Sequence, residues 1–185
     1  MFFQIKIIIS LFITYIMEIV GISLGNVCYS AEWAVFNNIR KKKEEGYNTC
    51  PFDLMISNYN GIIQCINNDF EDFYNPIYLH VNSHGIFNTK YNFGFNHESP
   101  GHADLYLHEN WPEGTNHFIN NNFHHFIERY KTRIDSFDNY LCDPNNYIIF
   151  VIQFCYDTNP NNDCLELRNA LQNKYPGLKY EIKVI

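Results

Sequence analysis

Apolar and polar residues alternate along the chain in blocks that predict strands separated by helices. Residues 147–154 are almost continuously apolar, which is typical of a central strand buried on both faces. Residues 18–23 predict a first strand, and 180–185 alternate as a last one. Apolar residues recur at helical spacing in 59–73 and 121–141. We therefore predict an α/β domain with a mostly parallel central sheet flanked by helices.

The middle of the chain, residues 78–111, contains five of the eight histidines. Short strands are predicted at 86–87 and 91–95, and the chain then turns at residues 96–101. This places His97 at a strand end, where catalytic groups are often held by a rigid sheet. An imidazole in such a place can accept a proton from a thiol near neutral pH.

A tight turn is predicted between the first strand and the first helix, and it places one cysteine, Cys28, at the start of that helix. Gly25 permits positive φ, Asn26 is a turn and capping residue, and a helix packed on its apolar side begins near Ala31. At a helix start, backbone N–H groups and the helix dipole favour the thiolate of Cys28 and lower its pKa. The same position equally suits a small buried cysteine that only packs.

Composition sets limits on size and partners. A chain of 185 residues with 46% hydrophobic residues is large enough for one domain with a substantial core. Its formal charge of -7 provides no basic footprint for nucleic acid. The dense basic run at 40–43 is followed by two glutamates, and we interpret it as the solvated end of a helix.

The spacing of the cysteines and histidines provides little evidence for a metal-binding site. The six cysteines contain no C-x-x-C pair, so reduced thiols are expected and the commonest zinc signature is absent. A zinc site remains an alternative if His80 and His84 share a helix face, with His97, Glu98 or another histidine of the region, His102 or His108, as third ligand.

The N-terminus is open to several interpretations. Residues 1–16 form an apolar extension with the length of a signal peptide, but Glu18 interrupts the run and the span is short for a membrane helix. We favour Met17 as the functional start, with one domain over 17–185. A signal or membrane anchor in 1–16, and hence a secreted or anchored protein instead of a cytoplasmic one, is the alternative.

Charged residues of two later segments are further candidates. Asp53 lies among apolar neighbours and either caps a turn or acts in a site, because a buried carboxylate needs a partner. Arg129 and Arg133 lie one helical turn apart and could clamp an anionic ligand. They could also pair with a buried acid such as Asp53 or form surface salt bridges.

Several segments, in their order along the chain, together resemble a family of papain-like cysteine peptidases found in bacteria and large DNA viruses. The resemblance covers most of the chain from about residue 18, and the family's activity was itself proposed from residue patterns. The segments that carry it are Ser23–Cys28 with Ala31, Cys50–Asp53, Asn68–Phe73, Asn88–His97 and Arg129–Ile134.

The resemblance implies roles for three residues. Cys28 matches the family's cysteine, Asp53 its Pro-Phe-Asp acid, and His97 its histidine after the Phe-x-His strand. Two positions depart from the family pattern: Leu54 replaces a tryptophan, and Glu98 directly follows the histidine. Since papain-like order is cysteine, histidine and then Asn or Asp, Asp53 precedes its expected place and the residue that orients the imidazole stays open.

The hypothesis that follows is acyl transfer through a thioester on a peptide, amide or thioester substrate. Cys28 attacks a carbonyl, His97 protonates the leaving group, and Asp53 or a later Asn orients the imidazole. Asn26 and the Cys28 backbone N–H would stabilise the oxyanion. This chemistry needs no cofactor and no metal.

A second hypothesis is a non-catalytic α/β binding module. Arg129, Arg133 and the loop around Asn96 would bind an anionic or glycan ligand.

Overall fold

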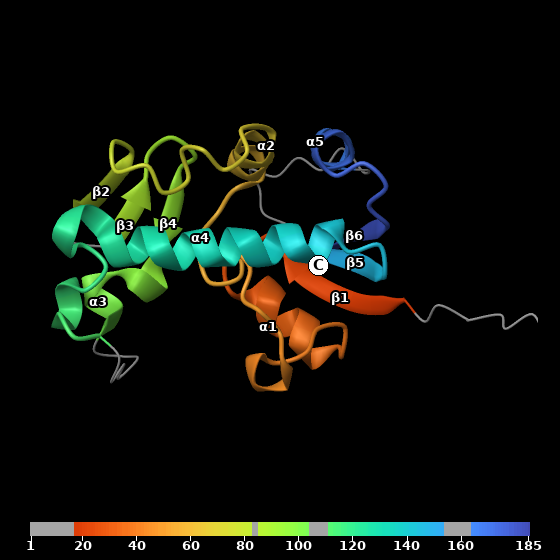
Figure 1. The fold of residues 1–185 in the computed structure, drawn as a ribbon, viewed down its shortest axis with the longest axis horizontal. Helices are drawn as coiled ribbons and strands as arrows, with labels where there is room; N and C mark the ends of the chain where they lie inside the picture. Colours follow the sequence, from red (N-terminus) through yellow and green to blue (C-terminus); the bar gives the residue numbers. More distant parts are fainter. Residues whose placement is uncertain (1–16, 83–84, 104–110, 154–163) are drawn as a thin grey trace, which may run out of the picture.

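The computed structural model describes residues 17–82, 85–103, 111–153 and 164–185, and it contains two three-stranded sheets. The first sheet is parallel, in the order β1 (Glu18–Ser23), β5 (Asn146–Ile152), β6 (Tyr180–Val184). The second is antiparallel, with β2 (Leu79–Asn82), β3 (Gly85–Asn88) and β4 (Phe93–Phe95). The predicted α/β class is confirmed (Figure 1).

Strand β5 is the central strand of the parallel sheet, as its apolar run predicts. Ile149 and Val151 pack with Ala34 of the first helix on one face. Ile148 and Phe150 join the main core on the other face. Successive side chains of a strand point to opposite faces, so a strand covered on both sides needs apolar residues at every position.

The helices lie close to the predicted positions. A long helix, α4, spans the length of the domain and passes both sheets (Figure 1), contacting β4 through Phe126 and Phe95 and β5 through Phe137 and Phe150. The bounds are α1 Tyr29–Phe36, α2 Tyr59–Asn67, α3 Pro100–Ala103, α4 Asn120–Cys142 and α5 Leu165–Lys174, with 3-10 turns η1 Lys43–Glu45, η2 Asn96–Glu98 and η3 Gly114–Asn116.

Helix α2 stops at Asn67, six residues before the predicted end. Asp69 and Phe70 have φ of 51° and 57°, which places both residues in the left-handed region that ends a helix. Phe70 and Phe73 are nevertheless fully buried. The helical spacing of these two residues arises because both side chains pack into the same core, although the backbone that carries them forms a turn and not a helix.

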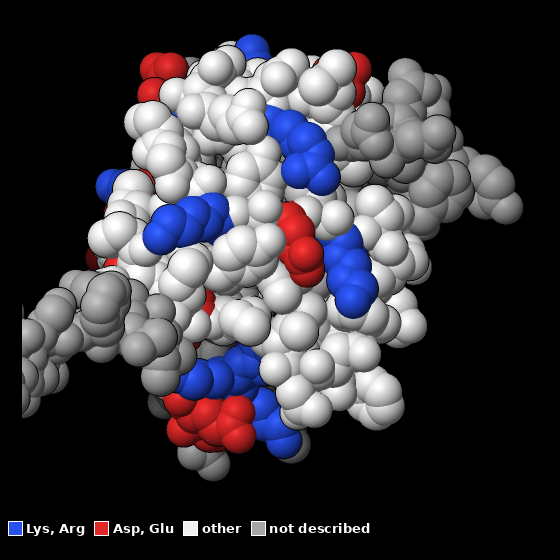
Figure 2. All heavy atoms as spheres, turned by 90° about the vertical axis from the view of Figure 1, so that its right-hand side faces the viewer, with Lys and Arg blue, Asp and Glu red and all other residues white. Residues whose placement is uncertain are grey.

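The interpretation of residues 40–43 as a solvated helix end is wrong. Helix α1 ends at Phe36, and the Arg40 side chain turns inward, where it is 10% exposed and bonded to Asp53. The residues that follow are exposed and carry both signs of charge, including a Lys41–Glu18 ion pair. Figure 2 shows this mixture at the lower part of one face, and the other charged side chains on that face are scattered over uncharged surface.

The predicted apolar extension, residues 1–16, lies outside the described residues. Of the helices in the described ranges, none has the length and apolar character that crossing a membrane requires.

Candidate active site

The turn after β1 presents Cys28 at the start of α1. Gly25 and Asn26 have φ of 82° and 59°, so two consecutive residues adopt left-handed backbone. A Cβ atom on Gly25 would lie 2.0 Å from the Ser57 Oγ atom. Only glycine fits this position, as the sequence indicates.

Three serines hold this turn in place. The Ser57 hydroxyl accepts a hydrogen bond from the Asn26 backbone N–H at 3.0 Å and donates to the Leu24 carbonyl at 3.3 Å. Ser30 donates to the Gly25 carbonyl at 2.9 Å, and Ser23 accepts from the Gly25 N–H at 3.0 Å. All three serines are buried, so the turn is rigid where the cysteine leaves it.

Cys28 is the N-cap residue of α1, and its sulfur contacts an imidazole. Its Sγ atom lies 3.3 Å from Nε2 of His97, a residue 69 positions further along the chain. His97 lies in η2, directly after β4, so the predicted placement at a strand end is confirmed. Both side chains are half-buried and remain partly accessible to solvent.

Although Cys28 lies at a helix start, the net shift of its thiol pKa is upward. Burial raises that pKa above its ordinary value, and the negative charges of Glu32 and Glu98 raise it further. The backbone N–H of Cys28 offsets only part of this rise. The expected net depression of the Cys28 pKa is therefore wrong.

Glu98, next to His97, is fully buried and pairs with both candidate arginines of α4. Its Oε1 atom lies 3.2 Å from Nε of Arg129 and 3.1 Å from Nη1 of Arg133. Tyr130 donates a hydrogen bond to Oε2 at 3.1 Å. This cluster fastens η2, and with it the imidazole, to the long helix. Of the interpretations given to the arginines, pairing with a buried acid is the one observed, and that acid is Glu98.

A family model described as "Putative papain-like cysteine peptidase" matches residues 20–185. The chain belongs to this family. A search of curated proteins and a search of solved structures returned no match. The match begins inside β1 and includes both Cys28 and His97.

Asp53, which corresponds to the acid of the family's Pro-Phe-Asp motif, forms a clamp within its own segment. Its carboxylate accepts hydrogen bonds from Arg40 at 2.8 Å, the Tyr47 hydroxyl at 3.0 Å and the Cys50 backbone N–H at 2.8 Å. The side chain is 2% exposed, and burial raises its pKa even though Arg40 opposes the shift. These contacts explain why an acid occurs among apolar neighbours, and its role in catalysis stays a prediction.

Asn26, the predicted oxyanion residue, lies at the correct end of α1. Its backbone N–H is used by Ser57, and its half-buried side-chain amide makes no hydrogen bond to any residue in the described ranges. Its role in stabilising an oxyanion stays a prediction.

The zinc arrangement that requires His80 on a helix is wrong, because His80 lies in strand β2. His84 and His108 lie outside the described residues, and Glu98 is held by arginines. The described cysteines 28, 50, 65, 142 and 164 are all free thiols, as expected.

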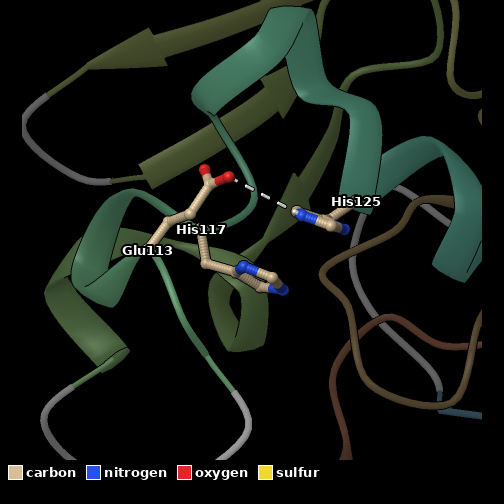
Figure 3. Close-up of side chains that lie close together, drawn as sticks. All are labelled: Glu113, His117 and His125. Atoms are coloured by element: carbon tan, nitrogen blue, oxygen red, sulfur yellow. Dashed lines mark ion pairs between the residues drawn. The ribbon is translucent and has the colours of Figure 1, made fainter.

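Sequence reasoning missed a different cluster, formed by Glu113, His117 and His125 (Figure 3). The spacing of four between Glu113 and His117 was its one signal in the sequence. The third residue follows eight positions later, so only the fold brings the three together.

Proposed function

We propose that this protein is a thiol hydrolase or acyltransferase of the cysteine-peptidase type, with Cys28 as nucleophile and His97 as acid and base. The single observation that carries the proposal is the 3.3 Å contact between Cys28 Sγ and His97 Nε2 at the open start of α1. A base within hydrogen-bond reach of a nucleophile, positioned by separate elements, is the arrangement that such chemistry needs.

The reaction begins when the Cys28 proton moves to Nε2 of His97. The thiolate attacks a carbonyl carbon, forming a C–S bond, and the resulting oxyanion meets the Asn26 amide and the Cys28 backbone N–H. The C–N, C–O or C–S bond to the leaving group then breaks, and His97 protonates that group. Water attacks the thioester, gives a proton to His97, and the thiol is regenerated.

The surroundings support these roles by fixing both partners. Cys28 follows a turn held by buried serines, and His97 precedes Glu98, which is paired with two arginines. The nucleophile and the base are thereby held close together by separate elements. This reduces the entropy that is lost when the two groups reach a reactive geometry. The rise in the Cys28 pKa makes the imidazole necessary, since burial disfavours the thiolate by itself.

Alkylation by iodoacetamide, followed residue by residue with mass spectrometry, tests the pair without a known substrate. Cys142 is exposed and serves as the internal reference thiol. We expect Cys28 to react at least about tenfold faster than Cys142 near pH 7, because a thiolate reacts and a thiol does not. Equal rates for the two cysteines in the folded protein would contradict the proposal.

Turnover requires its own test. A library of peptide and thioester substrates is screened with the wild-type protein, and each hit is repeated with Cys28→Ala and with Cys142→Ala as the matched control. Hydrolysis that survives Cys28→Ala would end the proposal, whereas loss in that variant alone supports it. For a true nucleophile the loss should exceed about 1000-fold.

The alternative is anion binding by the α4 arginines. An open hollow of about 500 Å³ is lined by Lys43, Thr49, Arg129, Thr132 and Arg133, among others. The residues that line it include three basic side chains and no acidic one, while Glu98 pairs with both arginines from beside the hollow. Phosphate that binds the wild type and not Lys43→Gln, in a protein whose Cys28 reacts no faster than Cys142, would favour this function.

A further inference from the structure

Two histidines and a glutamate converge beside the start of α4 (Figure 3). Glu113 and His117 flank the short turn η3, and His125 lies near the beginning of α4. One potential ligand atom from each residue lies within 4.8 Å of the others. Nε2 of His125 is 3.8 Å from Oε1 of Glu113. Side chains from two elements therefore face one small region.

The polar atoms of this cluster are not all satisfied. His117 is only 8% exposed, and its Nδ1 atom has no hydrogen-bond partner in the described part of the chain. The same holds for the buried Oε2 atom of Glu113, whose other oxygen accepts a 3.3 Å hydrogen bond from the Asn121 amide. Leaving buried polar atoms unpaired costs stability, because they lose their hydrogen bonds to water without replacement. A ligand that accepts their lone pairs removes this cost.

A carboxylate outside the cluster lies within ion-pair distance of the second histidine. Nδ1 of His125 lies 3.5 Å from Oε2 of Glu128, one turn further along α4. A carboxylate on one ring nitrogen keeps the proton there and leaves the lone pair of the other nitrogen free for a metal. That other nitrogen, Nε2, is the one that faces Glu113.

An apolar wall surrounds the buried histidine. The Trp111 ring stacks on His117 with centroids 6.2 Å apart, and the Phe118 ring meets its edge at 4.8 Å. A dry surrounding strengthens bonds between a cation and its ligands.

We propose that Glu113, His117 and His125 bind one divalent transition-metal ion, with Zn²⁺ as the best match. Two imidazoles and one carboxylate are a ligand set that zinc uses, with water at the fourth position. The His125 side chain is 30% exposed and that of Glu113 28%, which leaves an entry path and room for that water. The two imidazole rings are stacked with centroids 4.1 Å apart and 19° between planes, so one ring must rotate before both lone pairs converge.

The ion would fasten a strained junction. Between His117 and His125 the chain passes through Asn121, Asn122 and Phe123, whose φ values are 53°, 56° and 63°. Three consecutive left-handed residues are costly, above all at a phenylalanine. A metal bound on both sides of them stabilises this conformation. Arg129 lies one turn beyond His125 and pairs with Glu98, so the site supports the same helix segment that holds η2.

The test is metal titration of the full-length Cys28→Ala protein, freed of metal by a chelator. This background removes Cys28 with its neighbouring imidazole as a competing zinc site. Binding of Zn²⁺ is measured against a chromophoric chelator, and Co²⁺ is added separately to record its absorption spectrum. We expect one equivalent of tight binding, a tetrahedral Co²⁺ spectrum without thiolate charge transfer, and a melting temperature that rises with Zn²⁺.

Single variants identify the ligands. His117→Gln and Glu113→Gln should each weaken Zn²⁺ binding by more than about 100-fold, beyond the effect of losing an outer partner. His124→Gln is the matched control, because His124 is adjacent to His125, is 55% exposed and pairs with Glu128 outside the proposed ligand set, although its ring also lies 5.2 Å from that of His125. Its affinity should be unchanged. Glu113 is the partly exposed ligand, so its variant tests the site even where a change at buried His117 impairs folding.

Three results would overturn the proposal. The first is no stoichiometric binding by the Cys28→Ala protein. The second is a sulfur signature in the Co²⁺ spectrum, which would place the metal on cysteine. The third is a loss of affinity in His124→Gln as large as in Glu113→Gln, which would move the metal to the exposed group of His124, His125 and Glu128. None of these readouts depends on hydrolase activity.

Discussion

At the scale of single residues, the reactivity proposed for Cys28 rests on one neighbour, His97. Burial raises the pKa of the thiol, and the carboxylates Glu32 and Glu98 act in the same direction. The imidazole of His97 at 3.3 Å is the group that can accept the proton and then stabilise the thiolate as an ion pair.

Replacing His97 by Gln should therefore shift the alkylation profile of Cys28 toward alkaline pH. Without the imidazole, the raised pKa keeps the thiol protonated until the pH passes the ordinary cysteine value of about 8.5. Near pH 7 we expect alkylation at least about tenfold slower than in wild type. Iodoacetamide rates between pH 5 and 10 measure this, with Cys142 as reference. Identical profiles would exclude a functional pair.

The Asp53→Asn variant distinguishes a structural role of this carboxylate from a catalytic role. The substitution leaves Arg40, whose side chain is 10% exposed, without its buried counter-charge. Breaking a buried ion pair costs about 3–5 kcal/mol of unfolding free energy. Urea unfolding measures the loss, and Asp135→Asn, at an exposed position, is the control. If Asp53 only clamps its segment, the Cys28 alkylation profile of the folded variant stays unchanged. A shifted profile would show that the carboxylate acts on the pair.

At the scale of elements, the turn between β1 and α1 decides where the cysteine lies. It depends on the left-handed backbone of Gly25 and on the hydroxyl of Ser57 packed against it. The opposite element, η2, is fixed by the ion pairs of Glu98 with α4. The contact between Cys28 and His97 is thus the product of two separately braced elements.

Gly25→Ala should be more harmful than the same change at Gly46. Both glycines have positive φ, 82° and 99°, so both variants suffer backbone strain of about 1–3 kcal/mol. A Cβ on Gly25 also meets Ser57 at 2.0 Å, while one on Gly46 meets no atom within 4 Å. We expect Gly25→Ala to lose more stability in urea unfolding and to slow Cys28 alkylation. Equal effects of the two variants would show that the clash is relieved by movement.

At the scale of the whole molecule, one aromatic core joins the two sheets. Phe52 is fully buried, and its ring contacts those of Phe70, Phe73, Phe93 and Phe137 at centroid distances of 6.0–6.1 Å. These partners belong to β4, to α4 and to the turn after α2. Because the sheets share this core, the domain should unfold in one cooperative step.

Phe52→Ala should destabilise the whole domain by about 3–5 kcal/mol, the usual cost of removing a buried phenylalanine ring. Unfolding is followed by circular dichroism and by tryptophan fluorescence, since Trp33 packs beside the parallel sheet and Trp111 beside His117. Both probes should shift together. Phe36→Ala, at a side chain 85% exposed, should change little. Separate transitions for the two probes would contradict a shared core.

Much of this architecture can be predicted from local patterns. The apolar run of β5, the periodicity of α4, and the Gly25 turn before Cys28 each depend on neighbouring residues, so the sequence is enough. His97 could be assigned to a strand end for the same reason. The early end of α2 could not be predicted from the sequence. Phe70 and Phe73 keep a helical spacing, although they pack into the core from a turn.

The sequence by itself determined the α/β class, the order of the main elements, and the cysteine and histidine that could react. Only the tertiary structure decided which charges meet: Glu98 with the two arginines, Asp53 with Arg40, and Glu113 with two histidines. It also reversed the expected shift in the Cys28 pKa. The physical reason is that backbone conformation follows from short-range steric and apolar patterns, whereas burial and electrostatic pairing depend on residues brought together from distant parts of the chain.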